Sequence, residues 1–167
     1  MLAAAGDVPT MEVLAAAELL RQWVPWLRVR VVNVVDLMAL LPPDVHPHGF
    51  SDEHFRRLFT DDAGVAFAFH CYPRAVHQLL HGRPRAERFH VRGFEEQGTT
   101  TTPFDMVVLN RISRYHLALA ALGHARRIPQ GGEDLAAHCR QMLARHHGYI
   151  REHFEDMPEV RNWRWSP

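Results

Sequence analysis

Short apolar runs alternate with amphipathic helical segments along this chain, and this alternation restricts the fold more than any other feature. The apolar runs cover residues 1–5, 27–35, 65–69 and 89–91. Strands that are apolar throughout are typical of parallel sheets buried on both faces, and their crossover connections are right-handed and usually helical. The sequence therefore predicts an α/β fold of three layers, α/β/α, with a mainly parallel sheet of about four strands in which the second strand lies outside the first.

One domain is expected, because 167 residues suffice for a single well-buried core. Residues 1–125 are predicted to form the α/β core, and residues 131–167 a long terminal helix and a docking tail. The first predicted strand opens at Met1 without preceding residues, so we expect the chain to be a fragment of a longer protein.

The amino-acid composition argues against two classes of partner, nucleic acids and membranes. The formal net charge is zero with histidines neutral, so no global field attracts nucleic acid or anionic lipid. No apolar run approaches the roughly 20 residues of a membrane span, and no signal peptide precedes the first strand. The two cysteines are far apart in sequence, which favours a reducing cytoplasm over a disulfide framework. We therefore expect a cytoplasmic protein that binds neither nucleic acid nor membrane.

The candidate functional residues follow the predicted strands, because ligands of parallel sheets lie beyond the carboxyl ends of the strands. They form a predicted interface, or a possible anion-binding site, and comprise Asp7, His70, Tyr72, Arg92, Thr99, Thr100, Thr101 and Thr102.

Four consecutive threonines precede Pro103 and indicate a helix start, since threonine caps the first turn and proline suits its first position. One threonine suffices for a cap. The others, with Arg92, could bind an anion such as phosphate, or their hydroxyls could satisfy backbone groups of a loop buried against another domain. The sequence leaves both readings open.

His70 directly follows a buried strand, so it could shuttle a proton, donate to a phosphate, pair with a carboxylate across an interface, or simply hold a neighbouring loop. The adjacent Cys71 has no basic neighbour in sequence that would make it reactive, and we interpret it as structurally inert.

Several patterns resemble metal or cofactor motifs but do not meet their requirements. Gly6-Asp7 and Asn33 have nearly the spacing of a thiamine-diphosphate signature, yet Val8 replaces its second glycine and Asn33 falls in a predicted strand. The histidine pairs in other segments lack a third ligand and are interpreted as solvated surface. These pairs are His77 and His81, His46 and His48, and His146 and His147.

The tail alternates arginine and tryptophan in Arg161, Trp163, Arg164 and Trp165. Such a pattern can stack on nucleic-acid bases. Because no wider basic patch supports that role, we expect the tryptophans to dock on the chain's own surface or on a partner.

Seven motifs together resemble the carboxy-terminal domain of phosphoketolase. They are GDVPT at 6–10, VRVVNVVDLM at 29–38, HGFSD at 48–52, FAFHCYP at 67–73, HVRGFEEQGTTTTPFDM at 90–106, NRISRYHLA at 110–118 and YIREHFEDMPEVRNWRW at 149–165. The resemblance covers almost the whole chain, and the threonine-containing motif is highly specific. The family usually has glycine where this chain has Cys71 and Phe154.

The resemblance implies a transketolase-type carboxy-terminal α/β domain, lacking the family's first antiparallel edge strand. Phosphoketolases use thiamine diphosphate and Mg to cleave xylulose 5-phosphate, often also fructose 6-phosphate, with phosphate into acetyl phosphate and an aldose phosphate. Their cofactor sites belong to two preceding domains, so none maps onto this chain.

We therefore expect this chain to hold no cofactor, metal or catalytic residue, and to be inactive by itself. Its expected partners are the catalytic domains of phosphoketolase, in the same or a separate chain, or a sister subunit of a homo-oligomer. The alternatives are a regulatory domain that binds phosphate or a nucleotide at Thr99–Thr102, and an independent phosphate-using enzyme that relies on His70.

Overall fold

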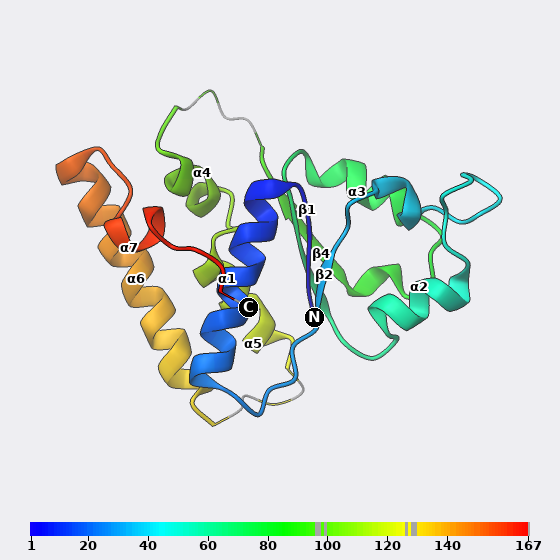
Figure 1. Cartoon of the computed structure of the whole chain (residues 1–167), viewed down its shortest axis with the longest axis horizontal. Helices are drawn as coiled ribbons and strands as arrows, with labels where there is room; N and C mark the ends of the chain where they lie inside the picture. Colours follow the sequence, from blue (N-terminus) through cyan, green and yellow to red (C-terminus); the bar gives the residue numbers. More distant parts are fainter. Residues whose placement is uncertain (96–97, 99, 126, 128–129, 167) are drawn as a thin grey trace.

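A four-stranded, fully parallel sheet forms the centre of the computed structural model, which describes residues 1–95, 98, 100–125, 127 and 130–166. The strand order is β2-β1-β3-β4, so β2 lies outside β1 as the sequence predicts. The carboxyl ends of all four strands meet at one edge of the sheet, at the top of Figure 1. We call this the strand-end edge.

The strands match the predicted runs in position, but β1 begins one residue later than predicted, β2 is shorter and β4 is longer. They are β1 Leu2–Ala5, β2 Val31–Asn33, β3 Val65–Phe69 and β4 Phe89–Gly93. The prediction of a strand over the whole of residues 27–35 was wrong. β2 is an edge strand that pairs only with the four-residue β1, so the ladder covers three residues. β4 is longer than predicted because it pairs with all five residues of β3.

Helices cover both faces of the sheet, which confirms the predicted three layers. Leu2 and Ala4 of β1 point into a core shared with α1 (Asp7–Trp23), α5 (Arg114–Gly123) and α6 (Gly132–His153). Alternate residues of the same strand point into a second core, whose helices lie on the opposite side of the sheet in Figure 1. This core is closed by the 3₁₀ turn η1 (Leu37–Leu40), α2 (Asp52–Phe59) and α3 (Pro73–Leu79).

Capping side chains and prolines mark three helix starts, of which the sequence analysis above predicts the one at Pro103. Ser51 caps α2, its hydroxyl accepting from the His54 amide, and Pro73 opens α3. Thr102 caps α4 (Pro103–Leu109), with Pro103 at the first position. The remaining short elements are η2 (Ala86–Arg88) and α7 (Pro158–Arg161).

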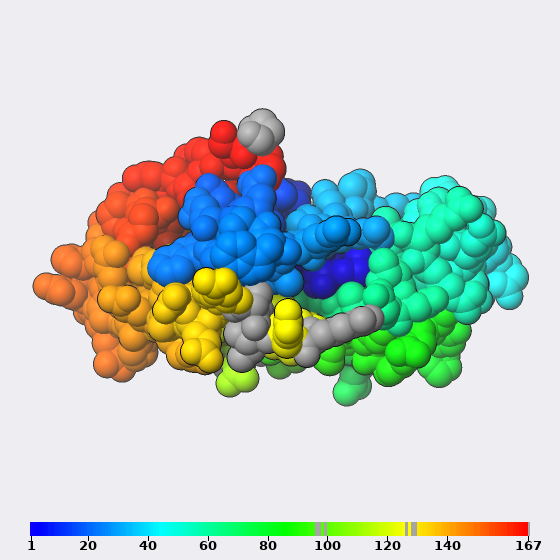
Figure 2. Space-filling view, turned by 90° about the horizontal axis from the view of Figure 1, so that it is seen from below, coloured from blue at the N-terminus to red at the C-terminus, as the bar shows by residue number. Residues whose placement is uncertain are grey.

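The tail docks its tryptophans on the chain's own surface. Trp163 Nε1 donates to Glu18 Oε2 of α1 at 2.8 Å, and Arg21 of α1 lies over the Trp165 ring at 5.1 Å. Figure 2 shows the red tail lying against the blue α1, and between blue and cyan segments a recess in which the dark-blue first residues are visible. The tail therefore covers the outer side of α1.

The two positions at which the resemblance implies glycine differ in backbone conformation. Cys71 is not among the described residues with positive φ, so it needs no glycine. Phe154 ends α6 in the left-handed region, at φ 57° and ψ 24°, and its side chain is 81% exposed. A non-glycine residue in this region is strained by roughly 1–2 kcal/mol.

Phe154→Gly is expected to raise the free energy of unfolding by about 1 kcal/mol, because it removes this strain and loses few contacts. Urea denaturation monitored by circular dichroism measures the change. Phe154→Ala is the matched control, since it removes the ring but keeps the strain, and it should leave stability nearly unchanged. A glycine variant no more stable than the alanine variant would contradict this account.

Candidate functional site

The strand-end edge is held together by two glycines that allow neighbouring backbone and side chains to approach closely. A Cβ atom on Gly6, at φ 102°, would lie 2.6 Å from the His70 imidazole. A Cβ atom on Gly93 would lie 2.1 Å from the Cys71 carbonyl oxygen. The loop after β3 therefore fits between the ends of β1 and β4. A larger residue in place of either glycine would displace this loop.

His70 is exposed, and its Nδ1 donates to the Ala5 carbonyl oxygen at 3.2 Å. This bond ties the end of β3 to the end of β1. Holding a neighbouring loop was one of the roles that the sequence left open for His70. Asp7 starts α1 beside it, and Tyr72 precedes α3 with its side chain 50% exposed. Among the residues that the structure describes, no hydrogen bond or ion pair links the predicted site residues to one another.

The threonines meet acidic side chains of the chain itself. The Thr102 hydroxyl donates to Asp156 Oδ1, and the Phe104 amide donates to Asp156 Oδ2 at 3.0 Å. Thr101 donates to Asp105 Oδ2 at 2.7 Å. Asp156 thus occupies two of the donors that an anion would use at the start of α4. Thr100 is exposed, and the predicted site residue Thr99 lies outside the described residues.

The interpretation of His146 as solvated surface was wrong. Its side chain is fully buried, and its Nε2 donates to Asp105 Oδ1 at 2.9 Å, so α6 is joined to α4. His146 lies seven residues after Cys139, on the buried stripe of α6, and this spacing was the signal in the sequence. His147 is exposed, as expected.

Beside the end of β4, Arg92 Nη1 donates to the Arg111 carbonyl oxygen at 3.3 Å. His116 Nδ1 shares a hydrogen bond of 2.8 Å with the buried Ser113 hydroxyl. Burial, followed by the positive charges of Arg92 and Arg111, lowers the pKa of His116 to about 4. We call Arg92, Arg111 and His116 the β4 basic cluster, and only Arg92 was predicted from the sequence.

Apolar side chains follow three neighbouring strands at the strand-end edge. Val35 after β2 is 89% exposed, Val8 after β1 is 48% exposed, and Tyr72 after β3 is 50% exposed. These strands are adjacent in the sheet, so the three residues lie at successive strand ends along one edge, and we call them the apolar row. The sequence predicted Tyr72 but neither valine: Val35 ends an apolar stretch that looks buried, and Val8 lies in the first turn of α1 among polar residues.

A buried ion pair was also missed. Glu12 of α1 accepts from Arg114 of α5 through both oxygens, at 2.6 Å from Nη2 and 3.1 Å from Nε, and also from the Arg114 amide at 2.6 Å. The two side chains are 6% and 8% exposed. Glu12 falls at helical spacing between Pro9 and Ala16 on the buried stripe of α1, which was the available signal.

The residues present do not fit a thiamine-diphosphate metal site. Asn33 Oδ1 accepts from the Thr10 hydroxyl at 3.2 Å, and Asp7 is exposed at the start of α1. His48 pairs with Asp36, whose pKa is lowered first by the bond from the Met38 amide and then by His48. In the described part of the chain, no group of three or more His, Cys, Asp or Glu residues is placed to hold a metal ion.

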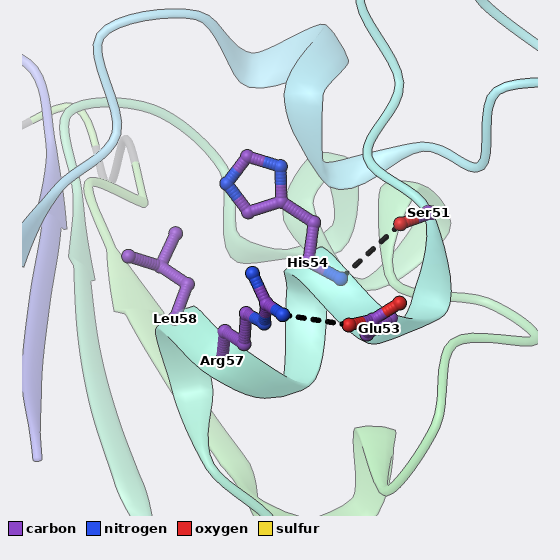
Figure 3. Close-up of a pocket in the computed structure, with 5 residues that line it drawn as sticks. All are labelled: Ser51, Glu53, His54, Arg57 and Leu58. Carbon is purple, nitrogen blue, oxygen red and sulfur yellow. Dashed lines mark hydrogen bonds and ion pairs between the residues drawn. The ribbon is translucent and has the colours of Figure 1, made fainter.

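A surface hollow of about 400 Å³ lies on α2, away from the strand ends. Figure 3 shows that its polar groups interact along the helix: Ser51 with the His54 amide, and Glu53 with Arg57 at 2.8 Å. Because these groups satisfy one another, the hollow is not a candidate site.

A family model described as the XFP C-terminal domain matches residues 1–165. The chain belongs to the phosphoketolase C-terminal domain family. It is 56% identical to a probable phosphoketolase of Brucella abortus (strain 2308), 53% to one of Bradyrhizobium diazoefficiens and 52% to one of Rhodopseudomonas palustris (strain TIE-1). Each match covers 99% of this chain but 21% of the relative, so the chain spans about a fifth of the length of these curated relatives. No helix in the described ranges is long and apolar enough to cross a membrane.

Asp156→Ala is expected to lower the free energy of unfolding by about 1–3 kcal/mol, because it leaves the Phe104 amide and the Thr102 hydroxyl without their acceptor. Thermal or urea denaturation measures this loss. Glu155→Ala is the control: it removes an exposed ion pair with Arg161 and should cost less than about 0.5 kcal/mol. Equal effects of the two substitutions would show that Asp156 does not cap α4.

The low pKa of His116 predicts a loss of stability in acid. The folded state favours the neutral imidazole, so the contribution is fully present above the ordinary pKa of about 6.5 and is lost as the pH falls toward 4. For this half-buried group the loss is roughly 1–2 kcal/mol.

Urea denaturation at pH 7 and pH 4.5 measures this change. His116→Asn should reduce the difference between the two pH values, whereas the exposed control His147→Asn should not. If both variants retain the full difference, His116 is not the group responsible.

Proposed function

We propose that this chain is the carboxy-terminal domain of a phosphoketolase. That enzyme would cleave xylulose 5-phosphate, fructose 6-phosphate or both with inorganic phosphate, releasing acetyl phosphate and an aldose phosphate. The family match over residues 1–165 and the relatives named probable phosphoketolase support this proposal. Thiamine diphosphate and Mg would be held by the two cofactor-binding domains that the family resemblance implies. Among the described residues of this chain, no group of three or more His, Cys, Asp or Glu residues is placed to hold a metal ion.

The role of this domain is assembly, and its strand-end edge docks against the cofactor-binding domains of the same enzyme. The row of Val8, Val35 and Tyr72 is the observation that carries this role, because exposed apolar side chains grouped along one edge are typical of an interface. The cofactor-binding domains are the partner because about four fifths of each curated relative lies outside the region that this chain matches. Asp7, His70 and Arg92 provide a polar rim around the row.

An anion-binding or regulatory role for the threonine loop has weaker support. The Asp156 carboxylate already accepts from the Thr102 hydroxyl and the Phe104 amide, so an incoming phosphate would have to displace a negative group of the chain itself. An independent enzyme based on His70 also has weaker support, because the hydrogen bond that His70 makes among the described residues goes from Nδ1 to the Ala5 backbone carbonyl and not to a titratable side chain.

A chimera tests the proposal. This chain replaces the matching fifth of the Brucella abortus relative, and acetyl phosphate formation from xylulose 5-phosphate is measured together with the oligomeric state. We expect the chimera to be active. Val35→Asp combined with Tyr72→Asp should lower its activity at least about 10-fold, because an interface that buries unpaired carboxylates is destabilised by several kcal/mol.

Val45→Asp is the matched control, since Val45 is 62% exposed in the loop between η1 and α2 and should tolerate a charge. An inactive chimera would count against the phosphoketolase assignment. An active chimera that is insensitive to the double substitution would contradict docking through the strand-end edge. Calorimetric titration of this chain alone with thiamine diphosphate and Mg should show no binding.

A further inference from the structure

A hollow of about 460 Å³ adjoins the apolar row at the strand-end edge. It lies between Val8 of α1, Phe104 of α4 and Phe154 at the end of α6, and we call it the Phe154 hollow. These three segments are found in the upper half of Figure 1. Its volume falls within the range of roughly 300–1,000 Å³ that is usual for small-ligand sites. Because Val8 belongs both to the apolar row and to the hollow, the hollow continues the surface that we propose to dock.

The hollow has apolar walls, and part of them is exposed. Val8 is 48% exposed and Phe154 is 81% exposed, whereas Phe104 and Val160 are nearly buried. At its left-handed φ of 57°, Phe154 is strained, and its exposed ring makes few contacts within the described chain that would offset this strain. Strained residues often serve binding, and a group from outside the chain that packs on the ring would use it.

The charged groups that line the hollow do not cancel. Two of the three carboxylates are paired with guanidinium groups that also line it: Glu12 with Arg114, and Glu155 with Arg161 at 2.5 Å. The third, Asp156, accepts from two neutral donors, the Thr102 hydroxyl and the Phe104 amide. A carboxylate oxygen can accept two hydrogen bonds, so each oxygen of Asp156 keeps one acceptor position. The described lining of the hollow therefore carries one net negative charge.

We propose that the Phe154 hollow receives an arginine side chain from the cofactor-binding domains of the same enzyme. The guanidinium fork donates to the two remaining acceptor positions of Asp156, and the aliphatic stem packs on Val8 and Phe154. The inference rests on the proposed docking of the strand-end edge. The source of the arginine is the four fifths of each curated relative that lies outside the matched region.

Other occupants fit the lining less well. A purely apolar side chain would fill the hollow but cover Asp156 without pairing it, and burying an unpaired carboxylate is costly. An anion would be repelled by the same carboxylate. A lysine ammonium is compact and cannot span both carboxylate oxygens as a planar guanidinium does.

A titration of the full 167-residue chain, monitored by two-dimensional NMR, tests the preference of the hollow. The probe is n-propylguanidinium chloride, which reproduces the arginine side chain beyond Cα, at pH 7.5 and constant ionic strength. The neutral 1-butanol and the anionic sodium butyrate are the comparison probes. We expect n-propylguanidinium to give saturable shifts at Val8, Phe104 and Phe154 by roughly 50 mM, 1-butanol to bind more weakly, and butyrate not to bind.

Two variants separate the charge from the apolar wall. Asp156→Asn should weaken n-propylguanidinium binding at least about 10-fold, and Phe154→Ala at least about 3-fold. Asp44→Asn is the matched control, because Asp44 is exposed in the loop between η1 and α2 and its loss changes the net charge equally. Circular dichroism verifies folding. Phe154→Ala is expected to keep the stability of the chain, so the test does not depend on the folding of Asp156→Asn.

The chimera described above tests the source of the arginine. Phe154→Ala should lower the temperature at which half of its acetyl phosphate formation is lost by at least about 2 °C, although the same substitution leaves the stability of the chain alone nearly unchanged. Val45→Ala is the control and should not lower this temperature, because Val45 lies outside the hollow.

The proposal is overturned by any of three results. These are n-propylguanidinium binding no better than 1-butanol, Asp44→Asn weakening binding as much as Asp156→Asn, and an active chimera whose heat resistance is unchanged by Phe154→Ala. An inactive chimera would instead refute the phosphoketolase assignment and with it the source of the arginine. The binding series on the chain alone would still decide whether the hollow takes a guanidinium group.

Discussion

The buried ion pair between Glu12 and Arg114 joins parts of the chain that are 102 residues apart, and the packing on that face of the sheet depends on it. Glu12 lies on α1 directly after the first strand, and Arg114 is the first residue of α5. A buried pair tolerates the loss of one partner poorly, because an isolated charge then stays in an apolar surrounding. Here all the bonds to Glu12 come from one residue, including its backbone amide, so the start of α5 is fixed on α1.

The same arginine also contacts two further segments, helix α4 and the tail. Its guanidinium lies 4.9 Å from the Trp163 ring centre and 5.5 Å from that of Phe104. Trp163 in turn donates to Glu18, which lies six residues after Glu12 on α1. Helix α4 and the tail are thus positioned around one charged group, so the end of the chain belongs to the same packed unit as its beginning. Asp156 adds a further link between the end of the chain and α4, because it accepts from the Thr102 hydroxyl and the Phe104 amide.

Most of the strands could be predicted from the sequence, because the apolar runs that mark them are local patterns. β1 and β3 are buried on both faces, and apolar runs of four or five residues are sufficient to locate them. The end of β2 could not be predicted, because it depends on the length of its partner strand β1. In this pairing Val31 lies opposite Leu2, which is 29 residues earlier in the chain. Helix starts at Ser51 and Thr102 were predictable from capping chemistry alone. The candidate site was predicted less completely, because Asp156, Arg111 and His146 acquire their roles from residues that are distant in sequence.

The close approach at Gly6 and Gly93 has a consequence for how the strand-end edge can meet another surface. The loop after β3 is wedged between its two neighbours, so Tyr72, Val8 at the start of α1 and Val35 after β2 are attached to a framework with little freedom to rearrange. Neighbouring strands are spaced by about 4.8 Å, and this spacing sets the intervals along the row. A partner that fits those intervals loses little conformational entropy on this side of the contact, and one that does not fit cannot rely on the edge to adapt. The edge is therefore preorganised, and its selectivity for a partner comes from its stiffness as well as from its chemistry.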